Sequence, residues 1–249
     1  KMSTVYADTL EPSVPTKNTT LGASGDSITI GANSINTNVI QDSGGNVLFQ
    51  SDGSGTLSNV NSAFSADLKL LSTSTVSSAT SSVSITSNID SSYDVYIFKF
   101  YNVHCEDDDR QFSFQVSTDG GSSYGIAGTS TVFQAYHFED NSATSLSYQA
   151  SVDRANSTSY MNIGISMNNP ADSSLDGELY LFAPSSTTYV KHWYATTQLM
   201  AGATGVVGPW SVNNFTAGYF NTTSAVDAID FEFSSSSQMD NAVIKMYGL

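Results

Sequence analysis

Hydrophobic and polar residues alternate in short runs through much of the second half of the chain. Gln111–Val116 and Ile229–Phe233 place Phe, Val or Ile on one face and polar side chains on the other. This period of two is typical of a β-strand with one buried face. Tyr93–Val103 is apolar on both faces, as expected for a strand in the middle of a buried sheet. These patterns predict β-sheets, not helices, in residues 91–249.

Further runs of strand character follow along the chain, separated by clusters of turn residues. They lie at Thr131–Phe138, Leu146–Val152, Tyr160–Met167, Glu178–Phe182, Tyr189–Met200 and Ala242–Tyr247. The strongest turn signal is Asp119-Gly120-Gly121, because Asp and Gly both favour tight turns. Together the runs predict about eight to ten strands. The sequence therefore predicts an all-β fold with a C-terminal jelly-roll-like β-sandwich.

Residues 18–65 have a different pattern. Segments of about five residues, such as Asp26–Ile30, Ile35–Ile40 and Asn46–Gln50, alternate with glycine-bearing turns, which predicts a slim ladder of short strands. The few apolar side chains cannot offset the entropy cost of ordering this segment alone. We therefore expect it to interlace with identical copies in an oligomer, a trimer. The alternative is a Ser/Gly-rich leader without fixed structure.

These patterns divide the chain into three parts. Residues 1–65 form a slim N-terminal attachment and oligomerisation region, residues 66–90 a linker with the first strand or strands, and residues 91–249 the sandwich domain. We expect the boundary between the first and second parts to lie between about residues 62 and 82.

Composition and charge exclude several classes of function. The chain has 23 acidic and 8 basic side chains, a formal charge of −15, so nucleic-acid phosphates and anionic membranes would be repelled. No apolar run is long enough to cross a bilayer, and the lone Cys105 cannot form an intrachain disulfide. Residues 1–30 lack the pattern of a secretory signal peptide, so we expect assembly in a cytoplasm, with no membrane insertion.

Two short motifs suggest catalysis, and both lack the partners they need. Gly25–Ile28 resembles the nucleophile block of GDSL-type esterases, but no aspartate lies three residues before the last histidine, His192. In His104-Cys105 the two side chains are adjacent on a strand and point to opposite faces, so they cannot form a nucleophile–base pair. We predict that the protein is not an enzyme and binds no cofactor.

The densest carboxylate run lies between two predicted strands. It consists of Glu106, Asp107, Asp108 and Asp109, whose oxygens are of the type that Ca²⁺ prefers. The run lacks the alternating ligands and central glycine of an EF-hand loop. We therefore interpret it as a solvated hairpin loop, with metal binding as the alternative, and treat the acidic loop Asp172–Asp176 in the same way.

Aromatic residues are the other candidate for a site. Most of the 13 Tyr and 13 Phe residues must fill the core, but rings on the rim of a sandwich can stack on sugars or anchor a protein interface. Our candidates for partner contact are Trp193, Tyr194, Trp210 and Tyr219. No carboxylate pair is placed in a way that would predict a glycosidase.

Three segments of the chain resemble parts of known proteins. The opening Met2-Ser-Thr-Val-Tyr-Ala-Asp-Thr-Leu-Glu-Pro12, followed by Leu21–Ile30, resembles the start of virion proteins from phages of marine bacteria, including fibre-like proteins of cyanophages. Phe114–Tyr124 resembles the strand and S-x-DGG-x-x-Y hairpin of a β-sandwich domain in phage tail, fibre and head proteins. The ending Ile244–Leu249 is similar to their I-x-L-Y-G-[IL] closing strand.

This resemblance implies a structural protein of the virion, usually trimeric, with an N-terminal part attached to the particle and a C-terminal domain facing outward. The attachment region would include Tyr6, Asp8, Leu10 and Pro12. Expected partners are two further copies of the chain, other tail or capsid proteins, and a glycan or protein of the host surface. The expected role is a fibre or spike for host adsorption. The alternatives are a capsid decoration or head-protrusion protein without receptor binding and, less favoured, a carbohydrate-cleaving tailspike.

Overall fold

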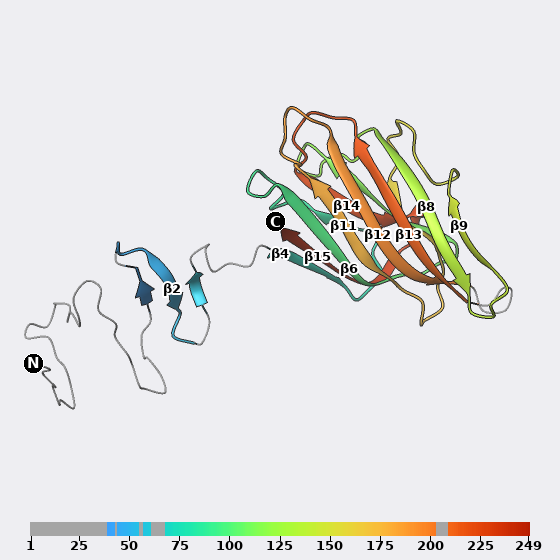
Figure 1. The fold of residues 1–249 in the computed structure, drawn as a ribbon, viewed down its shortest axis with the longest axis horizontal. Helices are drawn as coiled ribbons and strands as arrows, with labels where there is room; N and C mark the ends of the chain where they lie inside the picture. Colours follow the sequence, from blue (N-terminus) through green and yellow to red (C-terminus); the bar gives the residue numbers. More distant parts are fainter. Residues whose placement is uncertain (1–38, 43, 55–56, 61–67, 203–208) are drawn as a thin grey trace, which may run out of the picture. The chain divides into compact units, whose positions relative to one another are not determined.

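The computed structural model describes residues 39–42, 44–54, 57–60, 68–202 and 209–249 (Figure 1). The chain divides into two compact units, Lys1–Ser65 and Ala66–Leu249. The segments Asp26–Ile30 and Met2–Pro12, on which part of the sequence prediction rests, lie outside the described residues.

The N-terminal unit contains a small antiparallel sheet of order β1-β2-β3. Its strands are β1 (Val39–Gln41), β2 (Val47–Ser51) and β3 (Leu57–Val60). The β1–β2 turn is fixed by Asp42, whose carboxylate accepts hydrogen bonds from the backbone N–H of Gly44 at 2.8 Å and of Asn46 at 2.9 Å. The expected strand at 46–50 is confirmed as β2.

The C-terminal unit consists of two antiparallel sheets (Figure 1). The first, which we call the large sheet, has in spatial order β4 (Lys69–Val76), β15 (Met239–Gly248), β6 (Val95–Cys105), β11 (Leu175–Phe182), β12 (Lys191–Ala201), β13 (Trp210–Phe220), β8 (Gly128–Phe138) and β9 (Thr144–Tyr148). The second, the small sheet, has β10 (Met161–Met167), β7 (Arg110–Ser117), β14 (Ala228–Phe233) and β5 (Ser82–Ile85). A 3₁₀ turn, η2 (Ser234–Ser236), separates β14 from β15.

The core lies between the two sheets, which pack face to face as in a β-sandwich. Rings from one sheet contact rings from the other, because alternation places them all on inward faces. The centroids are 5.5 Å apart for Phe98 and Phe231, 5.2 Å for Phe100 and Phe112, and 4.9 Å for Phe114 and Trp193. All six rings are at most 2% exposed. The prediction of an all-β fold is confirmed.

Each expected run in residues 91–249 overlaps a strand, but β9 ends at Tyr148, so the expected strand at Leu146–Val152 is wrong beyond that residue. β13 was not expected, because polar residues interrupt the apolar alternation of residues 210–220. Two of them, Asn214 and Thr216, point inward and are buried. Asn214 is satisfied by Thr197 on β12, at 3.3 Å, and by Gln134 on β8, also at 3.3 Å. Hydrogen bonds between neighbouring strands thus replace apolar packing, and a search for hydrophobic periodicity misses such a strand.

The expected linker at 66–90 contains two strands that belong to the sandwich. β4 pairs with β15, and β5 pairs with β14. Two expected hairpins are corrected by the topology: Glu106–Asp109 connects β6 to β7, and the Asp119-Gly120-Gly121 turn lies between β7 and β8. In both cases the flanking strands are in different sheets. The turn itself is present, with φ of 72° at Gly120 and 83° at Gly121, values that favour glycine.

Candidate functional site

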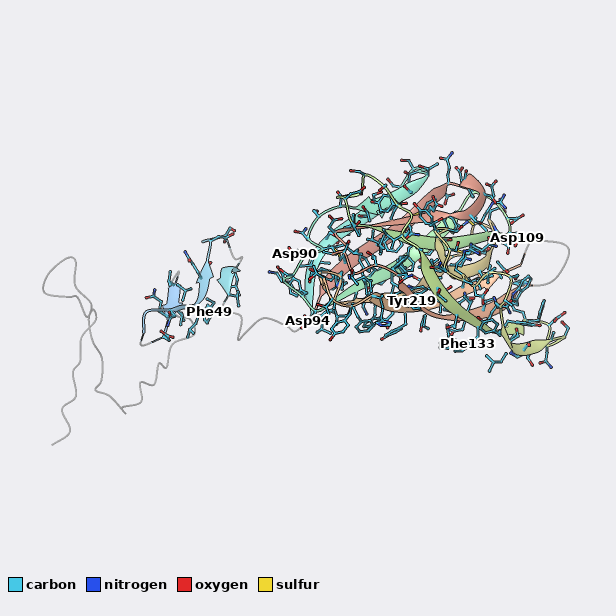
Figure 2. All side chains as sticks on the ribbon, turned by 90° about the horizontal axis from the view of Figure 1, so that it is seen from above. Phe49, Asp90, Asp94, Asp109, Phe133 and Tyr219 are labelled. Carbon is cyan, nitrogen blue, oxygen red and sulfur yellow. The ribbon has the colours of Figure 1, made fainter. Side chains whose placement is uncertain are left out.

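The outward face of the large sheet carries exposed aromatic and apolar side chains, and we call it the aromatic face. Alternation along β8, β9 and β13 points Phe133, Leu146, Tyr148 and Phe215 away from the core. They are 43%, 70%, 54% and 37% exposed, respectively. Phe133 and Phe215 stack across the β8–β13 pair at 4.9 Å with an interplanar angle of 11°. Figure 2 labels Phe133 and Tyr219 on the same side of this unit.

A second group of rings lies on the same face at β11 and β12. Tyr180 and Tyr194 are directly paired in the strand register and stack at 4.7 Å with an angle of 11°. Phe182 lies 5.8 Å from Tyr194. Burial, followed by the charge of Glu178, raises the pKa of the Tyr180 hydroxyl, so this group stays neutral and able to donate a hydrogen bond at physiological pH.

Beside these rings the face is hollowed. The hollow has a volume of about 460 Å³, and we call it the aromatic hollow. Its walls include Phe182, His192, Tyr194 and Tyr219, with Thr129 and Thr131 on the β8 side. The register explains the shape: Ala217 lies between Tyr194 and Thr131, while Tyr219 lies between His192 and Thr129. A single methyl group among larger neighbours leaves the space open.

The structure separates the four aromatic residues that the sequence analysis selected. Tyr194 and Tyr219 line the aromatic hollow. Trp193 is a core residue that points inward, is 2% exposed and packs edge-on against Phe114, because successive strand residues face opposite sides, and it is also among the residues that line the hollow. Trp210 is half-buried at the edge of the core, stacked on Phe138 at 4.9 Å. The selection by composition alone could not distinguish the two faces.

A second hollow, of about 610 Å³, lies at the other end of β8, β11 and β12 and is more polar. It is lined by His137, Glu139, Asn141, Asp172, Asp176 and Met200, among others, and so includes part of the second acidic loop. Protein groups engage some of these side chains: Asp176 accepts a hydrogen bond from the N–H of Asn102 at 3.0 Å, and His137 lies 3.1 Å from the Asn141 side chain.

The acidic run Glu106–Asp109 is held by the protein itself. The Asp108 carboxylate accepts hydrogen bonds from the N–H of Asn169 at 3.0 Å and from the side chain of Asn168 at 3.3 Å. Asp107 lies 3.8 Å from the guanidinium of Arg110. In the described part of the chain, no three His, Cys, Asp or Glu side chains are grouped in a way that could hold a metal ion.

The His104–Cys105 pair has the geometry of a strand and not of a catalytic dyad. Cys105 is fully buried, and burial raises the pKa of its thiol to about 12, so the nucleophilic thiolate is scarce near neutral pH. His104 points the other way, with Nδ1 2.6 Å from the Asp240 carboxylate and Nε2 3.2 Å from the carbonyl oxygen of Pro170. The histidine connects β6 to β15 and to the loop after β10.

The outward face of the small sheet is polar, and it is buried at Gln115 and Asp230 but exposed at Ser84 on the edge strand β5; we call it the covered polar face. Strand pairing places Ser84, Asp230 and Gln115 in one row, and Asp230 is only 3% exposed. Gln115 Nε2 lies 3.1 to 3.3 Å from the carbonyl oxygens of Ile126, Thr158 and Ser159. These contacts join the sheet to the loops 118–127 and 149–160, which cover it.

Asp230 is the centre of this network. It accepts a hydrogen bond from Ser84 and another from the Tyr160 hydroxyl, the latter at 2.9 Å. Burial, and then the charge of Asp230, raise the pKa of Tyr160 and of Glu232. The alternation of Gln111–Val116 and Ile229–Phe233, with one buried face, predicted that these polar positions would face solvent. The covering loops gave no signal, because their contacts are made by backbone carbonyl groups.

Tyr6, Asp8, Leu10, Pro12 and the Gly25–Ile28 motif lie outside the described residues. Within the described part of the chain, no helical segment has the length and apolar character needed to span a lipid bilayer. No family model, no curated protein and no solved structure matches this chain.

Proposed function

We propose that this protein is a structural component of a phage virion, a trimeric fibre or spike that contacts the host surface with its C-terminal domain. The observation that carries the proposal is the strand order of the sandwich, which supports a jelly roll. This architecture is widespread in viral capsid and lectin domains. The likeness of the chain's two ends to fibre-like phage proteins supports the same conclusion.

The support for a jelly roll is found by following eight of the strands. In chain order these are β4, β5, β6, β7, β10, β11, β14 and β15. Numbered one to eight, they run 1-8-3-6 at one side of the large sheet and 2-7-4-5 in the small sheet. The neighbouring strands are therefore the pairs 1·8, 2·7, 3·6 and 4·5. A jelly roll has these pairs, because it forms when one long antiparallel pair of chain segments folds over into two sheets. The hairpin β8–β9 and the pair β12–β13 then extend the large sheet.

A trimer is favoured by the small N-terminal sheet. Its central residue Phe49 pairs with Ile40 on one side and Val60 on the other, which makes an apolar row across all three strands. Phe49 is 36% and Val60 39% exposed in the single chain. A three-stranded sheet this small has little stability unless its apolar side is covered. We propose that copies of the same row cover one another around a shared axis.

The first experiment locates and counts the protein on purified particles. Labelling with an antibody against the C-terminal domain is expected to mark the tail, and quantitative mass spectrometry is expected to give a few tens of copies per virion. In parallel, light scattering should give a mass of about three times the 26.4 kDa chain. Absence from purified virions would overturn the proposal, and a monomeric mass would overturn its trimeric part.

One observation favours a second candidate, a capsid decoration or head-protrusion protein. The aromatic face extends beyond the hollow to Phe133, Leu146 and Tyr148, and a broad exposed apolar surface is typical of a protein–protein contact. Label spread over the head, with hundreds of copies per particle, would select this candidate. The rings of the aromatic face would then be contacts with the capsid.

A further inference from the structure

The aromatic hollow combines three properties that together define a class of ligand. Its rings offer flat apolar surfaces, its β8 side offers hydroxyl groups, and its walls carry no acidic side chain, lysine or arginine. At about 460 Å³ it lies within the range of small-molecule sites and is large enough for one or two sugar rings. All the residues named on its walls belong to the described part of the chain.

The rings are held in place before any ligand arrives. Tyr194 is fixed by its stack on Tyr180 at 4.7 Å, and Tyr219 lies 6.2 Å from His192 across the β12–β13 pair. A ring that is already oriented loses little conformational entropy on binding. Tyr194 and Tyr219 therefore form a preorganised apolar surface, and the methyl group of Ala217 leaves space between them.

Polar groups lie on the opposite wall. The Thr129 Oγ1 accepts a hydrogen bond from the N–H of Asn156 at 3.0 Å, and the hydroxyl hydrogen is not used in that bond. The Thr131 hydroxyl is 3.4 Å from the carbonyl oxygen of Ala217, a long contact that a better acceptor can replace. A ligand between the walls would meet rings on one side and hydroxyl donors on the other.

The net charge of the chain further restricts the class of ligand that the aromatic hollow can bind. The chain has a net charge of −15, and the wall residues include no lysine or arginine to offset it, so phosphorylated, sialylated or uronic-acid ligands are disfavoured. The same argument disfavours a nucleotide, although its base could stack. A neutral sugar has one apolar face formed by C–H groups and a rim of hydroxyls, which matches both walls.

We propose that the aromatic hollow binds a neutral saccharide, with the apolar face of a pyranose ring on Tyr194 and Tyr219 and its hydroxyls toward Thr129 and Thr131. The use of this site in host adsorption rests on the proposed function, whereas saccharide binding itself does not. Each site would be weak, and three per trimer would give useful avidity.

The test begins with the full chain on an array of neutral and acidic bacterial glycans, followed by calorimetry with the neutral oligosaccharide that gives the strongest signal. Tyr219→Ala and Tyr194→Ala are each expected to weaken binding about tenfold, the loss of about 1.4 kcal/mol. Ala217→Phe fills the hollow and is expected to abolish binding. Because position 217 is on the outward face, the larger side chain needs no space in the core.

The matched control is Phe215→Ala. Phe215 is 37% exposed and stacked at 11° on Phe133, while Tyr194 is 39% exposed and stacked at 11° on Tyr180. The two substitutions remove equivalent rings from neighbouring strands, and only one ring lines the hollow. Phe215→Ala should leave saccharide affinity within about twofold, and an equal loss in both variants would overturn the assignment of the site.

The remaining outcomes separate this site from the proposed function. Binding of neutral glycans by a protein that is absent from virions would support the saccharide site and overturn the virion role. Presence in virions with no glycan bound on the array, or a preference for acidic glycans, would overturn the saccharide site alone. If Tyr219→Ala instead prevents incorporation into particles, the hollow is a contact with another virion protein and the proposal is wrong.

Discussion

On the outward face of the small sheet Gln115 and Asp230 are buried beneath loops, whereas on the outward face of the large sheet Tyr194 and Phe215 remain more than a third exposed. The positions are equivalent, since each is an outward residue in the middle of a sheet. The usual distribution of polar and apolar residues is reversed. Buried polar groups must find partners inside the protein, while exposed clustered rings indicate a surface that is used for contact.

The first and largest predicted effect comes from removing Asp230, the centre of the hydrogen-bond network on the covered polar face. Asp230→Ala leaves the hydroxyl of half-buried Tyr160 without its acceptor and also removes the acceptor of Ser84, which is exposed, while the vacated position of Asp230 itself is buried. We expect a loss of about 3 kcal/mol in the free energy of unfolding, because removing one partner of a buried hydrogen bond leaves the other partner unsatisfied. Urea unfolding at pH 7 measures it.

The matched control is Asp176→Ala on the aromatic face. Asp176 also accepts a hydrogen bond, from the N–H of Asn102, but it is exposed, so water can replace the lost partner. We expect a change of less than about 1 kcal/mol. Equal losses in the two variants would mean that the small sheet's outward face is accessible to water.

The second prediction concerns the close approach of β8 and β13 beneath the aromatic hollow. A Cβ at Gly218 would lie 2.4 Å from the carbonyl oxygen of Thr129 and 2.9 Å from the ring of Trp193. Gly218→Ala must push the strands apart and is expected to cost about 2 kcal/mol. Thermal unfolding measures the loss.

The control is Gly125, in a loop over the covered polar face, where an added Cβ would meet nothing within 4 Å. Gly125→Ala should therefore be nearly neutral, and a comparable loss there would contradict the steric argument.

The third prediction concerns the pH dependence of the turn at Asp119, in the loop 118–127 that covers part of the polar face. Hydrogen bonds from Ser117 and then Ser123 lower the pKa of Asp119 to about 2, from the usual 3.8. Because the folded-state pKa is depressed, the stabilisation is fully present above pH 3.8 and is lost as pH falls toward 2. The difference in unfolding free energy between wild type and Asp119→Asn should be constant at higher pH and shrink in that window. A difference that does not change with pH would show that the ionised carboxylate does not hold the turn.

These two faces also show how far the sequence could predict the molecule. Alternation was enough to place Phe112 and Phe114 in a core, because a period of two is a local property. The same alternation could not show that Gln115, which follows Phe114, would be buried. Its burial depends on hydrogen bonds to carbonyl groups of residues more than ten positions away. Alternation also could not separate Trp193 from Tyr194 as core and surface, because both faces of β12 mix polar with apolar or aromatic residues.

The smallest expected effect on stability is that of removing single rings from the aromatic face. Tyr194→Ala and Phe215→Ala each remove a ring that is more than a third exposed and stacked on one neighbour. Exposed stacking contributes about 0.5–1.5 kcal/mol at most, and the remaining ring keeps most of its own contacts. We therefore expect each variant to lose less than about 1.5 kcal/mol of unfolding free energy. Urea unfolding of both variants beside Asp230→Ala tests this. If the rings proved as costly to remove as Asp230, they would be part of the folded core, and their exposure would no longer indicate a binding surface. If they prove nearly dispensable for folding, their conspicuous clustering on one face must be explained by what that face contacts.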